Sequence, residues 1–143
     1  MTLVAAFDID GTIANNNHRE HLAKTKQWDE FHALAHADKP LQATVAVLDA
    51  LHDQGHRVEL WTARPEKYRQ DTEAWLQKHR IRYSKLLMRS DNDWRNAYIV
   101  KLEWYFKASP RPHLVFEDHP ETTRLLRAAG ACVHQVAEGH YTT

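Results

Sequence analysis

Residues 3–12 read LVAAFDIDGT, and they give the strongest indication of the fold class. It opens with an apolar run of strand length, and Asp8 and Asp10 follow at the end of that run, one residue apart. The Gly-Thr pair that comes next is a turn signal. We therefore predict a buried strand over residues 3–9. Two carboxylates at the end of a buried strand need an explanation, because burying a charge is costly.

Strand-like and helix-like segments alternate along the rest of the chain. Strands are predicted over residues 57–61, 86–88, 113–116 and 132–136. Helices are predicted over residues 41–52, 66–79 and 120–129, and a fourth is capped by Asp93 and ends before Pro110. This alternation predicts right-handed βαβ units with helices on both faces of a parallel sheet, an α/β three-layer sandwich.

The fourth predicted helix carries Ile99, Leu102 and Phe106 at helical spacing. We expect this apolar stripe to face the core. Lys101 lies well away from the stripe, so the pattern alone fits an exposed lysine as readily as a functional one.

Composition limits the classes of function. The chain has 143 residues, 43% of them hydrophobic, which predicts a single domain over residues 1–143. Nineteen basic and nineteen acidic side chains cancel, so any contact with nucleic acid must be local. A lone cysteine, Cys132, excludes a disulfide framework and is expected to be a small buried thiol. No apolar stretch is long enough for a membrane span, so a cytoplasmic protein is expected.

Polar side chains follow several predicted strands at the point where each ends. They are Asp8, Asp10, Thr62, Arg64, Glu117 and Asp118. Because ligands of such sheets bind beyond the carboxyl ends of the strands, we expect these groups to meet at one edge. Clustered carboxylates repel one another unless a cation lies between them, and oxygen ligands suit Mg²⁺. A magnesium site is therefore predicted.

Four segments carry a family resemblance. They are FDIDGT, LWTAR, the lysine of IVKLEWY and VFEDHPE, and together they resemble the four motifs of the haloacid dehalogenase (HAD) superfamily of aspartate-nucleophile phosphotransferases. Over longer stretches the sequence is similar to the 3′-phosphatase domain of phage-type polynucleotide kinase/phosphatase. The resemblance implies a Rossmann-like core sheet. Only some 45 residues separate the first two main strands, so no large cap domain is expected.

The resemblance also implies roles for the acidic residues. Asp8 would be the nucleophile and would form an aspartyl-phosphate. Asp10 would protonate the leaving alcohol, which calls for a raised pKa, and would later take a proton from water. The carboxylates of Asp8 and Asp118 and the backbone carbonyl of Asp10 would bind Mg²⁺. Glu117 would orient the site or bind the metal through water.

The same resemblance assigns the cationic and hydroxyl groups. Thr62 and Lys101 would hold the phosphoryl oxygens, with Lys107 as the fallback for the lysine. Arg19 and Arg64 match arginines near the phosphate and the nucleic-acid strand, although a surface position is the alternative for each.

One position departs from the family pattern. The family carries an aspartate four residues before the motif lysine, and this chain has Ala97 there. Asp91 or Asp93 is a candidate to compensate. There is also no GxxxxGK[ST] phosphate loop, so no kinase site of that kind is expected.

Residues 18–40 are rich in histidine, and His18, His21, His32 and His36 have helical spacings that fit a zinc site or structural roles. A short packing helix around Trp28 is the alternative that we prefer. The aromatic residues Trp94, Tyr98, Trp61 and Tyr68 are candidates either for stacking on a base or for ordinary packing.

The resemblance thus implies a Mg²⁺-dependent phosphatase that acts on a phosphorylated nucleic-acid end, with a 3′-phosphate preferred. A separate kinase or ligase would be its partner. A nucleotidase or other small-phosphoester phosphatase is the main alternative, because it would use the same residues. A receiver-like phosphoaspartate domain is less favoured, because such domains take phosphate on a later strand.

Overall fold

The main sheet has five parallel strands in the order β5-β4-β1-β6-β7. The computed structural model describes residues 1–139. Its strands are β1 (Val4–Phe7), β4 (Arg57–Pro65), β5 (Lys85–Arg89), β6 (Leu114–Glu117) and β7 (Val133–Gln135). The apolar run of residues 3–7 therefore forms the central strand of a parallel α/β sheet, as predicted.

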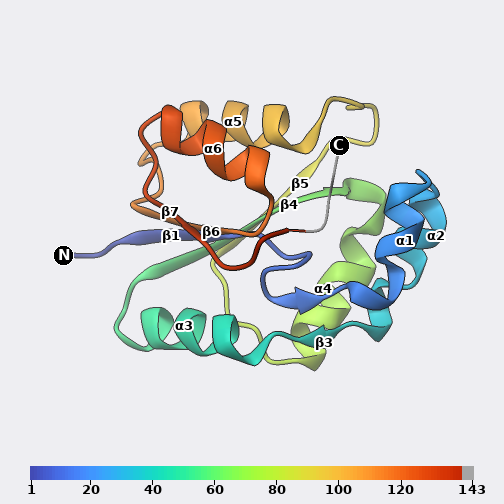
Figure 1. The fold of residues 1–143 in the computed structure, drawn as a ribbon. Helices are drawn as coiled ribbons and strands as arrows, with labels where there is room; N and C mark the ends of the chain where they lie inside the picture. The colour runs from blue at the N-terminus through green and yellow to red at the C-terminus, as the bar shows by residue number, and fades with distance from the viewer. Residues whose placement is uncertain (140–143) are drawn as a thin grey trace.

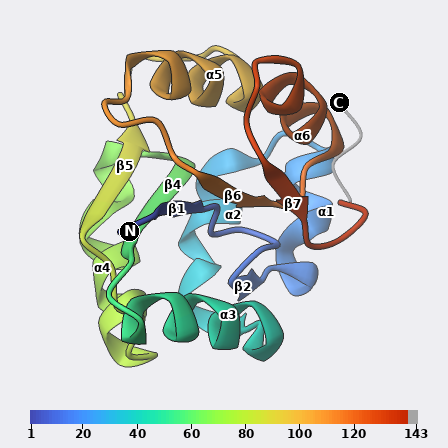
Figure 2. The ribbon, with the colours of Figure 1, turned by 90° about the vertical axis from the view of Figure 1, so that its left-hand side faces the viewer.

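Helices cover both faces of this sheet, so the predicted three-layer sandwich is confirmed (Figure 1). On one face lie α3 (Gln42–Asp53) and α4 (Arg69–Lys78). On the other lie α5 (Ala97–Lys107) and α6 (Pro120–Ala128). Figure 2 shows the sheet edge-on, between the pair α5 and α6 above and α3 below.

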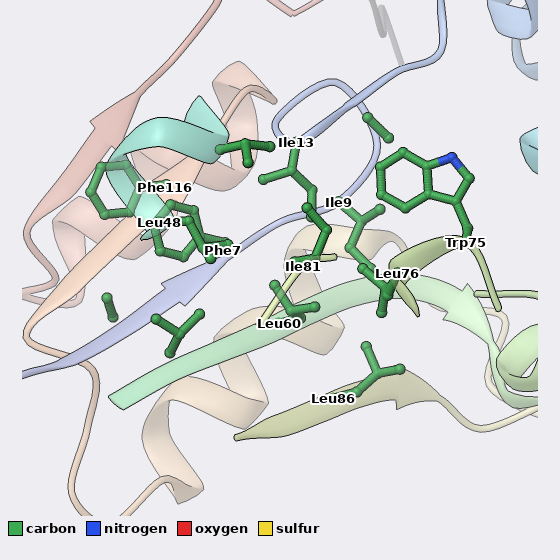
Figure 3. Close-up of a cluster of buried hydrophobic side chains, with 14 of the residues drawn as sticks. Phe7, Ile9, Ile13, Leu48, Leu60, Trp75, Leu76, Ile81, Leu86 and Phe116 are labelled. Carbon is green, nitrogen blue, oxygen red and sulfur yellow. The ribbon is translucent and has the colours of Figure 1, made fainter. Parts of the chain in front are cut away.

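The strict alternation of side chains along β1 divides the core in two. Phe7 stacks on Phe116 with ring centroids 4.3 Å apart, next to Leu48 of α3 (Figure 3). The same cluster contains Leu76 of α4. Ala6 belongs to the second cluster, under α5 and α6. Because β1 is buried on both faces, its sequence reads as a continuous apolar run.

Two segments differ from the prediction at their ends. Strand β4 runs on to Pro65 because it stays paired with β5 through an irregularity between Thr62 and Pro65. The segment predicted as one helix over residues 66–79 opens with a short 3-10 helix, η3 (Glu66–Tyr68), before α4. The prediction for Cys132 was wrong, because its side chain is exposed.

The buried face of helix α5 matches the predicted stripe only in part. Its buried residues are Val100, Lys101 and Tyr105, and Leu102 of the stripe packs against the core. The other two stripe residues, Ile99 and Phe106, are 40% and 51% exposed. Tyr105 packs into the cluster shared with α6, and Lys101 meets the carboxylates at the strand ends. These two tertiary contacts fix the rotation of the helix, and the apolar stripe could not reveal them.

The start of α5 also differs. Asn96 occupies the N-cap position, and Asp93 lies in the preceding loop, where it forms an ion pair with Arg95. The predicted cap at Asp93 was therefore wrong.

A small insertion, residues 14–40, separates β1 from α3. It contains β2 (Ala14–Asn15), η1 (Asn17–Arg19), α1 (Glu20–Lys24), α2 (Trp28–Ala33), η2 (Ala35–Ala37) and β3 (Lys39–Pro40). Strands β2 and β3 pair antiparallel. Figure 1 shows α1 and α2 at the end of the sheet towards which the strands point. Within residues 1–139 there is no large cap domain, and no helix there is long and apolar enough to cross a membrane.

Candidate active site

The carboxyl ends of three neighbouring strands bring the predicted polar side chains together. Asp8 follows β1 directly, and its backbone N–H donates to the carbonyl of Phe116 on β6 over 3.0 Å. Glu117 is the last residue of β6, and Asp118 comes next. Thr62 lies in β4 beside them in the strand order. All four polar side chains are buried.

Asp8, Glu117 and Asp118 form a compact acidic cluster. Each offers a ligand oxygen, and these oxygens lie within 4.8 Å of one another. Burial and the charge of Asp8 raise the pKa of Glu117 to about 8 and that of Asp118 to about 10. Burial disfavours the ionised forms of Glu117 and Asp118, and the neighbouring acidic groups add repulsion, so a cation between them would favour ionisation. An all-oxygen donor set fits a hard divalent cation such as Mg²⁺.

Gly11 and Thr12 shape the turn that carries Asp8. Gly11 has a φ of 81°, in the left-handed region, and a Cβ at this position would overlap the carboxylate of Asp118. The hydroxyl of Thr12 donates to Oδ2 of Asp8 over 3.2 Å. The turn therefore fixes the position of one carboxylate and leaves room for another.

Lys101 supplies positive charge to the acidic cluster. Its Nζ lies 2.7 Å from Oδ1 of Asp8 and 3.0 Å from Oε2 of Glu117. Burial by itself would lower the pKa of this lysine, but Asp8 and Glu117 raise it, so the ammonium group stays charged. The fallback residue Lys107 is exposed and pairs with Glu103. The lysine of the site is thus Lys101.

The replacement of the family aspartate by Ala97 is not compensated as we expected. Asp91 accepts a hydrogen bond from the backbone of Lys67, and Asp93 is paired with Arg95. The second carboxylate that contacts Lys101 comes instead from Glu117.

Thr62 and Arg64 are linked by the irregularity in β4. The hydroxyl of Thr62, which is fully buried, accepts a hydrogen bond of 3.2 Å from the backbone N–H of Arg64. The side chain of Arg64 is buried as well.

Asp10 lies between two buried guanidinium groups. Arg64 binds its carboxylate through two hydrogen bonds, Nε to Oδ2 at 3.1 Å and Nη2 to Oδ1 at 2.7 Å. Arg19 donates to Oδ1 of the same carboxylate through Nη2. Both arginines are almost fully buried, so the alternative of surface positions is wrong.

The expectation of a raised pKa for Asp10 is wrong for this state of the protein. Burial alone would raise the pKa, but the charges of Arg64 and Arg19 and the hydrogen bond from Arg64 hold it well below its usual range. Asp10 is therefore ionised and accepts hydrogen bonds rather than offering a proton.

Sequence reasoning missed Asp38, which holds Arg19 from the other side. Its carboxylate accepts from Nε of Arg19 at 2.9 Å and from Nη2 at 2.6 Å, and it lies 2.7 Å from Nε2 of His18. In the sequence, Asp38 precedes Lys-Pro and reads as an ordinary turn residue. Thr72 was missed as well, although its hydroxyl accepts a hydrogen bond from Nη1 of Arg64.

The histidines of residues 18–40 have other contacts. Among residues 1–139, the one group of three metal-ligating side chains is the acidic cluster. His18 binds Asp38, His32 packs on the ring of Tyr68, and His36 lies within hydrogen-bonding distance of the carbonyl of Ala33. These contacts are structural, which favours the alternative to zinc.

The candidate aromatic residues fall into different environments. Trp61 is buried in the cluster under α5 and α6, so it cannot stack on a base. Trp94 is 86% exposed on the loop before α5.

The central strand of the parallel sheet is followed by a buried aspartate, Asp8, and a lysine and an acidic pair from later segments lie beside it. This arrangement is that of the HAD-type phosphatases. Residues 3–141 match the family model described as the polynucleotide kinase PNKP phosphatase domain, and the chain belongs to this family. The comparison with curated proteins gave no match.

Solved structures agree with this assignment. Two structures, of the Pnkp1/Rnl/Hen1 complex and of the Pnkp1/Rnl/Hen1 RNA repair complex, each contain a chain with 26% identity to this one, with TM-scores of 0.83 and 0.84. Each match covers 98% of this chain but only 48% and 44% of the other, so this chain spans about half the length of those relatives. A hydrolase from Streptococcus pneumoniae TIGR4 shares the fold at 18% identity and a TM-score of 0.63, over 94% of this chain and 92% of that one.

Proposed function

We propose that residues 1–143 form one Mg²⁺-dependent phosphatase domain that removes 3′-phosphate groups from nucleic-acid ends through an aspartyl-phosphate intermediate. The observation that carries this proposal is the position of Asp8, whose carboxylate lies 2.7 Å from Lys101 and within the acidic cluster. The ammonium group of Lys101 beside this carboxylate would attract the phosphoryl group that Asp8 attacks.

The reaction has two steps. In the first, an oxygen of Asp8 attacks phosphorus, the bond between phosphorus and the ester oxygen breaks, and Asp10 gives a proton to the departing 3′-oxygen. In the second, water attacks the aspartyl-phosphate, Asp10 takes a proton from that water, and Asp8 leaves as a carboxylate. Inorganic phosphate and the free enzyme are the products.

Asp10 must be protonated to start this cycle, whereas the two arginines keep it ionised without substrate. A phosphate that binds near Arg19 and Arg64 would share their positive charge and add negative charge beside Asp10. Both effects raise the pKa of a carboxyl group. The arginines would therefore bind the substrate, and substrate binding would raise the pKa of Asp10.

The remaining groups would stabilise charge on the phosphoryl oxygens. Lys101 carries a fixed positive charge, and Thr62 has a hydroxyl held by the backbone of Arg64. The carboxylates of Asp8 and Asp118 and the backbone carbonyl of Asp10 would hold Mg²⁺, and Glu117 would orient the site or bind the ion through water. When bound, the ion would supply positive charge for the phosphoryl oxygens.

The family match and the RNA repair complex among the structural neighbours support a nucleic-acid end as substrate. A repaired end must next be phosphorylated or joined, so we propose that the domain acts with a separate kinase or ligase, in the cytoplasm.

A side-by-side turnover assay with Mg²⁺ tests the proposal. It compares a 3′-phosphorylated oligonucleotide, a 5′-phosphorylated one, nucleoside 3′- and 5′-monophosphates and an aryl phosphate. We expect the 3′-phosphorylated oligonucleotide to have the highest kcat/KM, and EDTA to abolish turnover. If mononucleotides are preferred by a wide margin, the protein is a nucleotidase with the same chemistry.

Two variants separate chemistry from folding. Asp8→Asn should lose all turnover, whereas Asp49→Asn, on the exposed side of α3, should keep the wild-type rate. Wild-type turnover by Asp8→Asn would refute the aspartyl-phosphate mechanism.

A further inference from the structure

Three rings, from Trp28, His32 and Tyr68, form a row that we call the aromatic wall. The rings of His32 and Tyr68 lie 4.6 Å apart at 32°, and those of Trp28 and His32 lie 6.4 Å apart at 27°. Trp28 and His32 come from α2 and Tyr68 from η3, so the wall joins the insertion to the end of β4.

Polar contacts hold the wall in place. The hydroxyl of Tyr68 donates to Oδ1 of Asp29 over 2.7 Å, and Nζ of Lys67 donates to the same oxygen over 3.2 Å. Trp28 meets the ring of the buried Phe31 edge-on, with centroids 5.6 Å apart. Trp28 is nevertheless 46% exposed, so nearly half of its surface is accessible to solvent although Phe31 and His32 pack against it.

The wall is joined to the proposed acid/base residue through Arg19. The guanidinium of Arg19 lies 4.2 Å from the ring centre of Phe31 and donates to the carbonyl of that residue over 3.2 Å. The same guanidinium binds Asp10. On the other side, His32, Tyr68 and Arg64 line one cavity of about 10 Å³, room for a single water.

This placement bears on the leaving group. In the proposed reaction Asp10 gives its proton to the departing oxygen, so the nucleoside leaves on the side of Asp10. Arg19 and Arg64 contact Asp10. His32 and Tyr68 of the wall line a cavity with Arg64, and Trp28 packs on Phe31, whose ring Arg19 contacts. Lys101 and Glu117 form a separate group around Asp8.

The chemistry of the wall suits a single strand. Base faces stack on aromatic rings regardless of sequence, and cations follow the backbone phosphates. Lys67 is an exposed cation 5.2 Å from the ring centre of Tyr68. With no net charge on the whole chain, binding of a nucleic acid depends on local cations, and Lys67 would exchange its exposed ion pair with Asp29 for a backbone phosphate.

We propose that Trp28 stacks on a base of the strand whose terminal phosphate is cleaved, with His32 and Tyr68 supporting it and Lys67 beside the backbone. This inference rests on the proposed function and specifies it further, because it makes the enzyme prefer a strand over a mononucleotide.

The test is a comparison of Trp28→Ala, Trp28→Phe and wild type on two substrates. For Trp28→Ala we expect KM for a 3′-phosphorylated single strand to rise about tenfold, the effect of losing one stacked base, with kcat little changed. Its kcat/KM for an aryl phosphate should stay within about twofold of wild type, because that substrate has no strand that extends from the cleaved phosphate to Trp28. Trp28→Phe should recover most of the loss.

Trp94→Ala is the matched control, since Trp94 is the other strongly exposed tryptophan of residues 1–139, on a different loop. It should leave both substrates unaffected. The proposal is overturned if Trp28→Ala slows both substrates equally, or if Trp94→Ala has the larger effect on the strand.

A binding measurement keeps this inference separate from the proposed function. If the wild-type protein hydrolyses the aryl phosphate but no oligonucleotide, the proposed substrate is wrong. Fluorescence anisotropy with a labelled, unphosphorylated single strand then tests whether Trp28 of the aromatic wall binds a base. Weaker binding by Trp28→Ala than by Trp94→Ala supports it, and equal binding overturns it.

Discussion

Arg19 binds Asp10 and Asp38 at the same time, and Nη2 of its guanidinium donates to both carboxylates. Asp10 is the proposed acid/base residue, and Asp38 comes from the far end of the insertion. With Arg64, whose Nη2 lies 3.9 Å from Asp38, the four residues form a buried group with balanced charge. The insertion therefore contributes to the site although it lies outside the core sheet.

Asp38→Asn should weaken this group. The substitution keeps the shape but leaves the charge of Arg19 balanced by Asp10 alone, and breaking a buried ion pair costs about 3 kcal/mol in the free energy of unfolding. Urea denaturation measures that loss. The surface pair of Asp49 with Arg82 supplies the control, because Asp49→Asn should cost less than about 1 kcal/mol. Equal losses in the two variants would show that Asp38 has no special role.

Lys101→Met should lower kcat/KM about 100-fold or more, because it removes a fixed charge from the site of phosphoryl transfer. Lys107→Met is the matched control, since that lysine is exposed and pairs with Glu103 on the same helix. We expect its kcat/KM to match wild type. Steady-state kinetics at saturating Mg²⁺ measures both, and similar losses would contradict the assignment of Lys101.

Gly11→Ala should disturb the acidic cluster, because its Cβ would meet the carboxylate of Asp118 and its φ is 81°. Gly55→Ala shares the strained backbone, with a φ of 85°, but its Cβ would enter open space. Backbone strain alone costs about 1–2 kcal/mol, so both variants lose stability in thermal melts. Only Gly11→Ala should also lose Mg²⁺-dependent turnover, and full activity in that variant would refute the close approach.

Without a divalent cation, stability should fall as pH rises. The pKa values of Glu117 and Asp118 are raised from 4.5 and 3.8 to about 8 and about 10, so the folded state binds more protons than the unfolded state between those limits. Two other groups act only at lower pH. Because the pKa of Asp10 is lowered, its effect on stability appears only below its usual value of 3.8. The pKa of His32 is lowered to about 4, so its protonation in the unfolded state reduces stability only below about pH 6.5.

Urea unfolding in EDTA between about pH 7 and pH 9 therefore isolates the acidic cluster. We expect the free energy of unfolding to decrease across this range. Added Mg²⁺ should reduce the decrease, since a bound cation favours the ionised carboxylates. A flat profile in EDTA would contradict the raised pKa values.

The α/β class, the parallel sheet and the edge at which the site forms could all be predicted from local sequence patterns. Hydrophobic periodicity and turn signals are local, so the bounds of β1 and α3 were predicted to within a few residues. The acidic residues at the ends of β1 and β6 were also placed correctly. The motif around Asp8 also indicated the phosphatase family whose sequence model matches residues 3–141.

Only the tertiary structure decided which groups pair. The rotation of α5 depends on the fit of Tyr105 under α6 and on the carboxylates that Lys101 meets, 93 residues away in the case of Asp8. The low pKa of Asp10 likewise depends on Arg64, 54 residues away. Charge interactions act through space, so no local pattern of residues could reveal them.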